Sequence, residues 1–354
     1  MIDWTESMRQ RFEYYIVDPK TWKDSKQITN VMSSTVNRDL SAGTLGSASI
    51  NITESIGECY IRIYLVAIQN GITAKYPIGT FLVQTPSSNF DGKIRSVTMD
   101  AYTPLIELKE KYPPLGYSVL KGGNVMDHVC RLVQENLRAP VVGSASDTKL
   151  YHDYVAQPDD TWLAFIQGLL PYDKKELSID EMGRILFAPE QKIASLQPVW
   201  TYNDDNSSII SPSITLNHDI YGIPNVVEVI YSNGEDYYYS KVVNDDENSP
   251  LSTVNRGREI QHRVTNPDIT GNPSAEQVEE YARQLLESLS SVEYTVSYTH
   301  AYCPVRVGDC VRLNYKDAGI KDVKAKVISQ SISCVPGCQV SETAVFTNKL
   351  WGVK

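Results

Sequence analysis

The chain contains two similar stretches, CYIRIYLVAIQNGITAKYPIGTFLVQTP at Cys59–Pro86 and VEYTVSYTHAYCPVRVGDCVRLNY at Val292–Tyr315. Each reads as an alternating strand, a polar connection, an aliphatic residue followed by a glycine, and a second strand. We align Gly79 with Gly308 and expect both glycines to lie in turns that need a positive φ. A further alternating strand follows each stretch, so the sequence predicts a duplicated β-module.

Strand patterns fill residues 10–102 and return after residue 224, while helical patterns lie between them. In the first stretch, Ile61 and Ile63 share one predicted strand face, and Arg62 lies on the opposite face. A chain of 354 residues is long enough for several domains. We therefore predict an α+β, β-rich fold, in which two tube-like β-barrel modules flank small α/β units. The predicted domains are 1–102 (first barrel), 103–148 and 149–215 (small α/β units), and 216–354 (second barrel, with a packed helix at 275–290).

Capping and turn residues mark the expected elements between the strands. The predicted helix starts are Thr103-Pro104, Asn124, Asp160, and Ser274 with Gln277 as its capping-box partner. The predicted hairpin turns are Asp180–Gly183 and Asn233-Gly234. The helix after Ser274 carries a wide apolar stripe, so we expect it to pack against the second barrel.

The composition limits the possible partners. The 43 acidic residues exceed the 33 basic ones and give a net charge of −10, which argues against a protein that grips phosphates. An acidic wall would suit a conduit through which DNA passes, and simple solubility is the alternative explanation. No apolar run approaches about 18 residues, so we expect no stable membrane insertion. The N-terminal MIDWTESMRQRF lacks an apolar segment, and we expect synthesis in the cytoplasm without a signal peptide.

Motifs for catalysis or cofactor binding are not found in the sequence. None of the five histidines pairs with another at i, i+4, and no phosphate loop or nucleophile elbow is present. We interpret His152-Asp153 as a surface pair. The acidic pairs Asp204-Asp205 and Asp245-Asp246 are interpreted as solvated loops, with calcium binding or glycoside hydrolysis as alternatives. We therefore predict no enzymatic activity, no cofactor and no metal.

Four cysteines lie close together in the C-terminal stretch: Cys303, Cys310, Cys334 and Cys338. Only Cys334 and Cys338 have a spacing typical of a zinc knuckle. A zinc site or a Cys334–Cys338 disulfide is therefore possible, but partly buried thiols are the preferred interpretation.

Tyrosine is abundant, with 22 residues against 6 phenylalanines. This excess fits either half-exposed strands or protein interfaces.

The order of several motifs resembles the tail hub proteins of bacteriophages, tailocins and related contractile injection systems. These motifs are IGTFLVQTP, DAYTPLIELK, IPNVVEVIYSN, ENSPLSTVNRG and VRVGDCVRLNY. The resemblance covers nearly the whole chain. It implies a homotrimer whose six barrels form a pseudo-hexameric ring, which joins the hexameric tail tube to a three-fold tip and lines the DNA path.

The same resemblance implies the location and the partners. The chain would lie at the distal end of the tail in the virion, after assembly in the host cytoplasm. It would contact a tail tube or distal tail protein, a tape measure protein, and a tip, spike or fibre protein, and DNA would pass without specific binding. Two alternatives stay open. Aromatic strands such as Tyr237–Tyr239 would suit a module that binds host cell wall or a receptor, and a wall hydrolase would need an acid pair or metal ligands.

Overall fold

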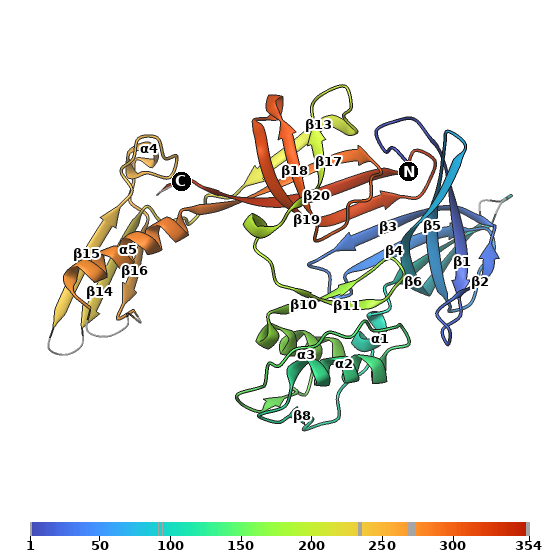
Figure 1. Ribbon diagram of the computed structural model, residues 1–354, viewed down its shortest axis with the longest axis horizontal. Coiled ribbons are helices and arrows are strands. Elements are labelled where there is room, and N and C mark those ends of the chain that lie inside the picture. The colour runs from blue at the N-terminus through green and yellow to red at the C-terminus, as the bar shows by residue number, and fades with distance from the viewer. Residues whose placement is uncertain are drawn as a thin grey trace. The chain divides into compact units, whose positions relative to one another are not determined.

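The computed structural model describes residues 2–90, 92–93, 95–232, 236–267, 269 and 273–351. The chain forms two compact units. Unit 1 comprises residues 1–214 and 298–344, and unit 2 comprises residues 215–297 and 345–354. Strands dominate and helices are short (Figure 1), which confirms the predicted β-rich α+β class. The four predicted domain boundaries stay a prediction.

The first half of unit 1 is an antiparallel sheet in which every neighbouring pair of strands runs antiparallel. Its strand order is β3-β4-β7-β6-β5-β1-β2. In β4, buried residues alternate with half-buried ones, as expected for a strand with one face on the core. The strands are β1 (Arg9–Val17), β2 (Asp24–Ile28), β3 (Val31–Asp39), β4 (Gly46–Ile52), β5 (Tyr60–Gln69), β6 (Ile72–Phe90) and β7 (Arg95–Tyr102).

The second half of the sheet is built from strands that are widely separated in sequence. They are β12 (Pro198–Asn203), β13 (Ile210–His218), β17 (Ser291–Ala301), β18 (Cys310–Tyr315), β19 (Ile320–Ser333) and β20 (Gln339–Lys349). Short 3₁₀ turns, η2 (Ile193–Ser195) and η3 (Lys316–Ala318), lie beside them in sequence. The strand order is β12-β18-β19-β20-β17-β13.

The two halves share one strand order. Across the sheet, the first half contains β1-β5-β6-β7-β4-β3 and the second contains β12-β18-β19-β20-β17-β13. Strands β1, β3, β4, β5, β6 and β7 therefore correspond, in the same chain order, to β12, β13, β17, β18, β19 and β20. The equivalence is not complete, because β1 and β5 pair antiparallel whereas β12 and β18 pair parallel. The predicted duplication is therefore seen as a repeat of the strand order.

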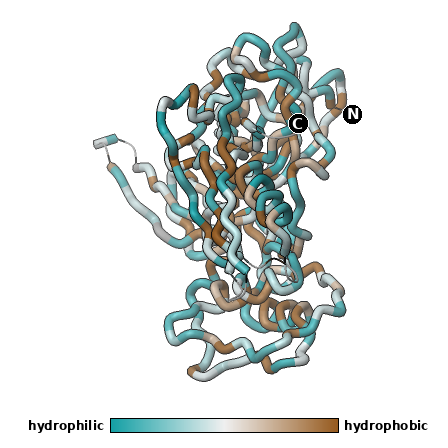
Figure 2. The backbone as a smooth tube through the Cα atoms, turned by 90° about the vertical axis from the view of Figure 1, so that its left-hand side faces the viewer, coloured by the Kyte–Doolittle hydropathy of each residue, from teal (hydrophilic) through white to brown (hydrophobic). Residues whose placement is uncertain are grey.

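A small helical part of unit 1 lies between the halves in sequence. Its elements are α1 (Ile106–Lys109), β8 (Ser118–Val119), α2 (Val125–Asn136), β9 (Tyr154–Val155), α3 (Trp162–Leu169), η1 (Leu170–Asp173), β10 (Lys175–Ile179) and β11 (Ile185–Pro189). One hydrophobic cluster joins residues of α1, α2, α3 and the β10–β11 hairpin, and so spans both predicted small units. Figure 2 shows hydrophobic residues along the helices of this part.

Two of the predicted helix starts need correction. The side chain of Asn124 caps α2 by accepting from the backbone N–H of Asp127, as predicted. However, α3 is capped by Thr161 and not by Asp160, whose carboxylate instead accepts from the N–H of Gln157. The Thr103 hydroxyl donates to the Thr44 carbonyl, and α1 begins only at Ile106. In both cases a neighbouring polar contact engages the expected capping group.

Unit 2 contains a separate three-stranded sheet with one long helix. The strands are β14 (Val226–Ser232), β15 (Tyr237–Val243) and β16 (Gln261–Thr265), in the order β15-β14-β16, and the short helix α4 spans Thr253–Arg256. The long helix α5 (Ala275–Leu289) begins with the predicted capping box of Ser274 and Gln277. It packs on β14 and β15, not on a barrel as expected. The predicted turn at Asn233-Gly234 lies outside the described residues.

Candidate functional site

The turn between β10 and β11 is bound to the first half of unit 1. The buried Arg62 side chain on β5 donates to the carbonyl oxygen of Met182 at 3.0 Å and pairs with Asp24 at 2.7 Å. The Trp22 indole N–H also donates to the Met182 carbonyl, at 2.7 Å. The Arg62 guanidinium is fully covered, so its contacts with Met182 and Asp24 compensate for its lost hydration.

The same turn also contacts the second half. The Glu181 carboxylate lies 2.8 Å from the Arg306 guanidinium and 3.5 Å from that of Arg38 on β3. Arg38 in turn donates to the Gln330 side-chain oxygen on β19 at 3.2 Å and to the Ile78 carbonyl at 2.6 Å. Glu181 is therefore a charged link between the two halves.

A cavity of about 260 Å³ lies at this junction. Its lining includes Arg38, Ile78 and Phe81 from the first half, Asp180 from the turn, and Arg306 and Asp309 from the second half. The segments around Gly79 and Gly308 thus face one space, although they come from opposite ends of the sequence.

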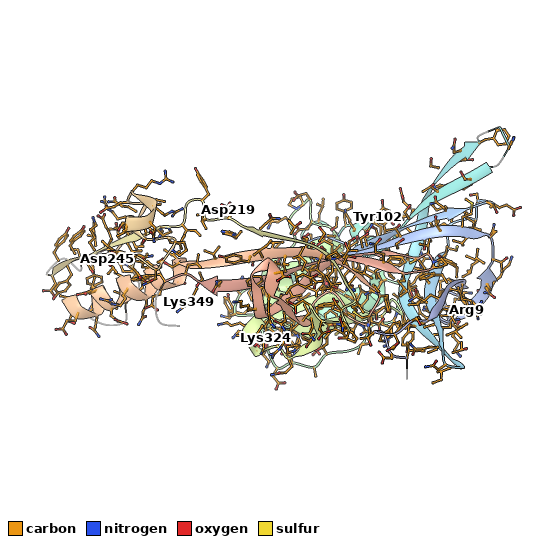
Figure 3. All side chains as sticks on the ribbon, turned by 90° about the horizontal axis from the view of Figure 1, so that it is seen from above. Arg9, Tyr102, Asp219, Asp245, Lys324 and Lys349 are labelled. Atoms are coloured by element: carbon orange, nitrogen blue, oxygen red, sulfur yellow. The ribbon has the colours of Figure 1, made fainter. Side chains whose placement is uncertain are left out.

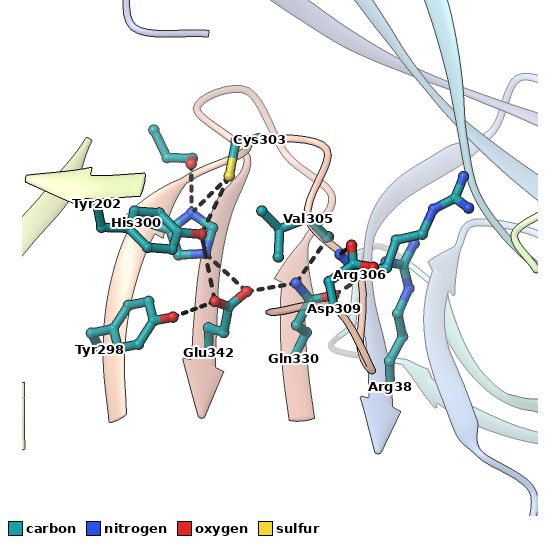
Figure 4. Close-up of polar contacts among 11 residues, drawn as sticks. Arg38, Tyr202, Tyr298, His300, Cys303, Val305, Arg306, Asp309, Gln330 and Glu342 are labelled. Carbon is teal, nitrogen blue, oxygen red and sulfur yellow. Dashed lines mark hydrogen bonds and ion pairs between the residues drawn. The ribbon is translucent and has the colours of Figure 1, made fainter. Parts of the chain in front are cut away.

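A buried polar network lies beside the junction, centred on Glu342 of β20 (Figure 4). Its carboxylate accepts from the Tyr298 hydroxyl, and from the Gln330 amide at 2.6 Å. Glu342 Oε2 also lies 3.4 Å from Nε2 of His300. These side chains are almost completely buried. The carboxylate therefore accepts hydrogen bonds from buried donors that water does not reach. A buried charge is stable only when it has such partners.

Two further groups complete the network. The Tyr202 hydroxyl lies 3.2 Å from His300 Nε2 and 3.3 Å from the Cys303 sulfur. Burial raises the pKa of both Tyr202 and Tyr298 well above the usual value, and the Glu342 charge adds to the effect. Burial alone would lower the pKa of His300, but hydrogen bonds with Cys303 and Glu342 raise the pKa to about 10. His300 is therefore protonated at neutral pH and forms a buried ion pair.

The alignment of Gly79 with Gly308 is wrong. Gly308 has a φ of 95° in the turn before β18, whereas Gly79 lies inside β6 at a register shift in the β5–β6 pairing. Since β5 corresponds to β18, the segment that takes the place of Val307–Cys310 (VGDC) is Ile56–Cys59 (IGEC), although Gly57 does not share the positive φ of Gly308. This four-residue match was the sequence signal for the correct equivalence.

Glycine at position 79 is required by packing. A Cβ atom there would lie 2.5 Å from ring atoms of Phe81, which is itself buried. We expect Gly79→Ala to destabilise unit 1 by about 1–3 kcal/mol, because a tightly packed ring cannot move aside without strain. Urea denaturation would measure the change. Gly57→Ala is the matched control, since no atom lies within 4 Å of its added Cβ. Equal stability of the two variants would contradict this explanation.

The remaining candidate groups are separate in the structure. The six cysteines are unpaired thiols, and Cys303, Cys310, Cys334 and Cys338 are buried. Within the described ranges, no three His, Cys, Asp or Glu side chains are placed to share a metal ion. The Asp205 carboxylate accepts from Ser207, and that of Asp246 from Asn248, so both order local turns. None of the helices among these residues has the length and apolarity needed to cross a membrane.

Comparison with known proteins identifies the fold. No family model and no curated protein matches the chain. Among solved structures, the tail protein from Neisseria meningitidis MC58 has a TM-score of 0.61 at 13% identity and covers 95% of this chain and 96% of its own. The 43 kDa tail protein of prophage MuSo2 from Shewanella oneidensis has a TM-score of 0.60 at 12% identity, with coverages of 95% and 98%.

A third similar structure is the Francisella PdpA-VgrG complex, with a TM-score of 0.55 at 8% identity. It covers 96% of this chain and 53% of the matched chain. Nearly full-length agreement with two tail proteins means that the chain has a tail protein fold. The resemblance found in the sequence is therefore confirmed at the level of the fold.

Proposed function

We propose that the chain is a structural tail hub protein, a homotrimer whose duplicated β-modules form a pseudo-hexameric ring. The observation that carries the proposal is the shared strand order of β1, β3–β7 and β12, β13, β17–β20. Three copies of such a chain present six similar modules and three identical subunits. One component can then match a six-fold tube on one side and a three-fold tip on the other.

The same proposal assigns the partners and the location. The ring would contact a tail tube or distal tail protein and a tape measure protein on one face, and a tip, spike or fibre protein on the other. It would lie at the distal end of the tail and be assembled in the host cytoplasm. The similarity to two tail proteins supports this placement. The net charge of −10 supports a DNA path that does not bind phosphates.

The proposed role is structural and not enzymatic. The most chemically suggestive cluster, Cys303, His300 and Glu342, is buried, and each member is engaged by neighbours in the network. A substrate would have to enter this packed core to reach it. We therefore assign the cluster to the stability of the second half.

The mass of the assembly tests the trimer. We expect light scattering of the purified chain to show a particle with three times the 39.7 kDa mass of one chain. The tube protein should be added if the chain alone dissociates, because obligate rings depend on their neighbours. A monomer or dimer that persists in the presence of the tube protein would contradict the proposal.

A second candidate function rests on two exposed rings. Tyr237 and Tyr239 on β15 are 66% and 53% exposed, whereas Tyr238 packs on the core of unit 2. Exposed aromatic rings can stack on sugars, so the second candidate function of unit 2 is binding of host cell wall or a receptor. Retention on purified cell wall that is lost in a Tyr237→Ala, Tyr239→Ala variant would favour this function over a purely structural one.

A further inference from the structure

The cavity between the two halves of unit 1 has the size and the walls of a small ligand site. Its volume is about 260 Å³, and ligand pockets in proteins begin at about 300 Å³. Apolar parts of the wall come from Ile78, Phe81 and Val307, and charged side chains complete the lining. Such a cavity suits a single side chain or a small molecule that has an aliphatic body and one polar end.

Most of the charged groups on the wall are already paired with each other or with a neighbour. The Glu181 carboxylate lies between two guanidinium groups, 2.8 Å from Arg306 and 3.5 Å from Arg38. The Asp180 carboxylate forms an ion pair at 2.6 Å with the arginine four residues further along the turn. These groups therefore have compensating charges within the protein, and the remaining charged group of the wall is Asp309.

Asp309 has a hydrogen bond but no cationic partner in the described part of the chain. Its carboxylate accepts from the backbone N–H of Arg306 at 2.8 Å (Figure 4). The Arg306 guanidinium contacts Glu181 instead. Lys324 of the neighbouring strand β19, labelled in Figure 3, donates to the Leu196 carbonyl at 3.3 Å. The half-buried Asp309 carboxylate thus lines the cavity with its negative charge uncompensated by an ion pair.

The surroundings of Asp309 favour the arrival of a cation. Burial raises the pKa of Asp309, and the charges of Glu181 and Glu342 add to this effect, although the hydrogen bond and the charge of Arg306 oppose it. A positive group beside the carboxylate would offset both the lost hydration and the neighbouring negative charges. An anionic ligand would instead have to displace Glu181 from the two arginines that it contacts.

We propose that the junction cavity is a binding site for an alkylammonium group, with Asp309 as its anionic partner and Ile78, Phe81 and Val307 around its aliphatic chain. A lysine side chain of another protein and a free aliphatic amine both have this chemistry. The proposal does not depend on the trimer, because every residue that carries it lies in unit 1 of one chain.

Three small probes of similar shape and different charge test the proposal on the intact chain. We would measure the affinity of butylammonium, butanol and butyrate by NMR titration at pH 7. We expect butylammonium to bind at least about tenfold more tightly than butanol, because the hydroxyl cannot form an ion pair. Equal affinities, or tightest binding of butyrate, would overturn the proposal. Nα-acetyllysine amide and diaminobutane then separate the two sources: the tighter of them identifies the ligand, and failure of both to bind would also overturn the site.

Asp309→Asn tests the assigned residue. Asparagine keeps an oxygen that can accept from the Arg306 N–H, so we expect the turn to form. Butylammonium should bind about tenfold or more weakly, while the affinity for butanol stays the same. Asp317→Asn is the matched control, since it removes an exposed carboxylate that is not part of the cavity wall, and it should leave both affinities unchanged.

The stability of the same variant distinguishes a binding role from a structural one. Because its surroundings disfavour the ionised form of Asp309, Asp309→Asn should be at least as stable as the wild type in urea at pH 7. A variant that loses stability but keeps its affinity for butylammonium would assign the carboxylate to the turn alone and overturn the proposal.

Discussion

Replacing Glu342 with alanine is expected to destabilise unit 1 by about 3–5 kcal/mol, the cost of removing one partner from a buried charged network. The change would leave the Tyr298 hydroxyl, the Gln330 amide and the His300 ring without their shared acceptor. No solvent reaches these groups, so water cannot compensate without a rearrangement of the core. The free energy of unfolding from urea titration would report the loss.

Two further variants make this prediction specific. Glu342→Gln keeps the shape and one acceptor oxygen, so we expect a smaller loss than with alanine. Glu54→Ala removes an exposed carboxylate from unit 1 and should change stability by no more than about 0.5 kcal/mol. If Glu342→Ala were as stable as Glu54→Ala, the network would not hold the second half together.

The stability of unit 1 is also expected to fall as the pH rises above neutrality. Burial opposes the charge on His300, but hydrogen bonds with Cys303 and Glu342 raise its pKa to about 10, compared with 6.5 for a free histidine. The folded state therefore binds one more proton than the unfolded state between these values. The stabilisation is complete below pH 6.5 and is lost as the pH rises towards 10, at up to about 1.4 kcal/mol per pH unit.

Urea titrations at pH 7, 8 and 9 would measure this slope. The slope between pH 7 and 8 belongs mainly to His300. Towards pH 9 the buried thiols add to it, because burial raises the pKa of Cys334 to about 11 in the folded chain, compared with 9.0 for a free thiol. His300→Gln should reduce the slope between pH 7 and 8, because glutamine carries no titrating proton. A wild-type stability that is constant from pH 7 to 9, or an unchanged slope in the variant, would contradict a charged His300.

Local elements were predictable where capping and turn residues act within a few positions. The Asn124 cap, the Ser274–Gln277 capping box and the Asp180–Gly183 turn all follow from short-range hydrogen bonds or backbone angles. The duplication was also visible. The equivalence of Gly79 and Gly308 was not correct, because alternation identifies a strand without identifying its partner. The match between Ile56–Cys59 and Val307–Cys310 carries more information than the alternation does.

The candidate site was less predictable, because its members come together only through distant strand pairings. Arg62 was expected on the face away from Ile61 and Ile63, but it is only 1% exposed. The β10–β11 turn covers that face, and no local pattern announces such a cover. Glu342 lies at a buried position of an alternating strand. A carboxylate at a position that the alternation predicts to be buried was the signal in the sequence for a buried polar network.

An averaged electron-microscopy image of the purified assembly tests the central claim most directly. The account predicts a ring with six similar lobes built from three chains, in which each chain contributes two neighbouring lobes. A ring that contains six chains, or three chains whose two halves form lobes of unlike shape around the axis, would contradict it.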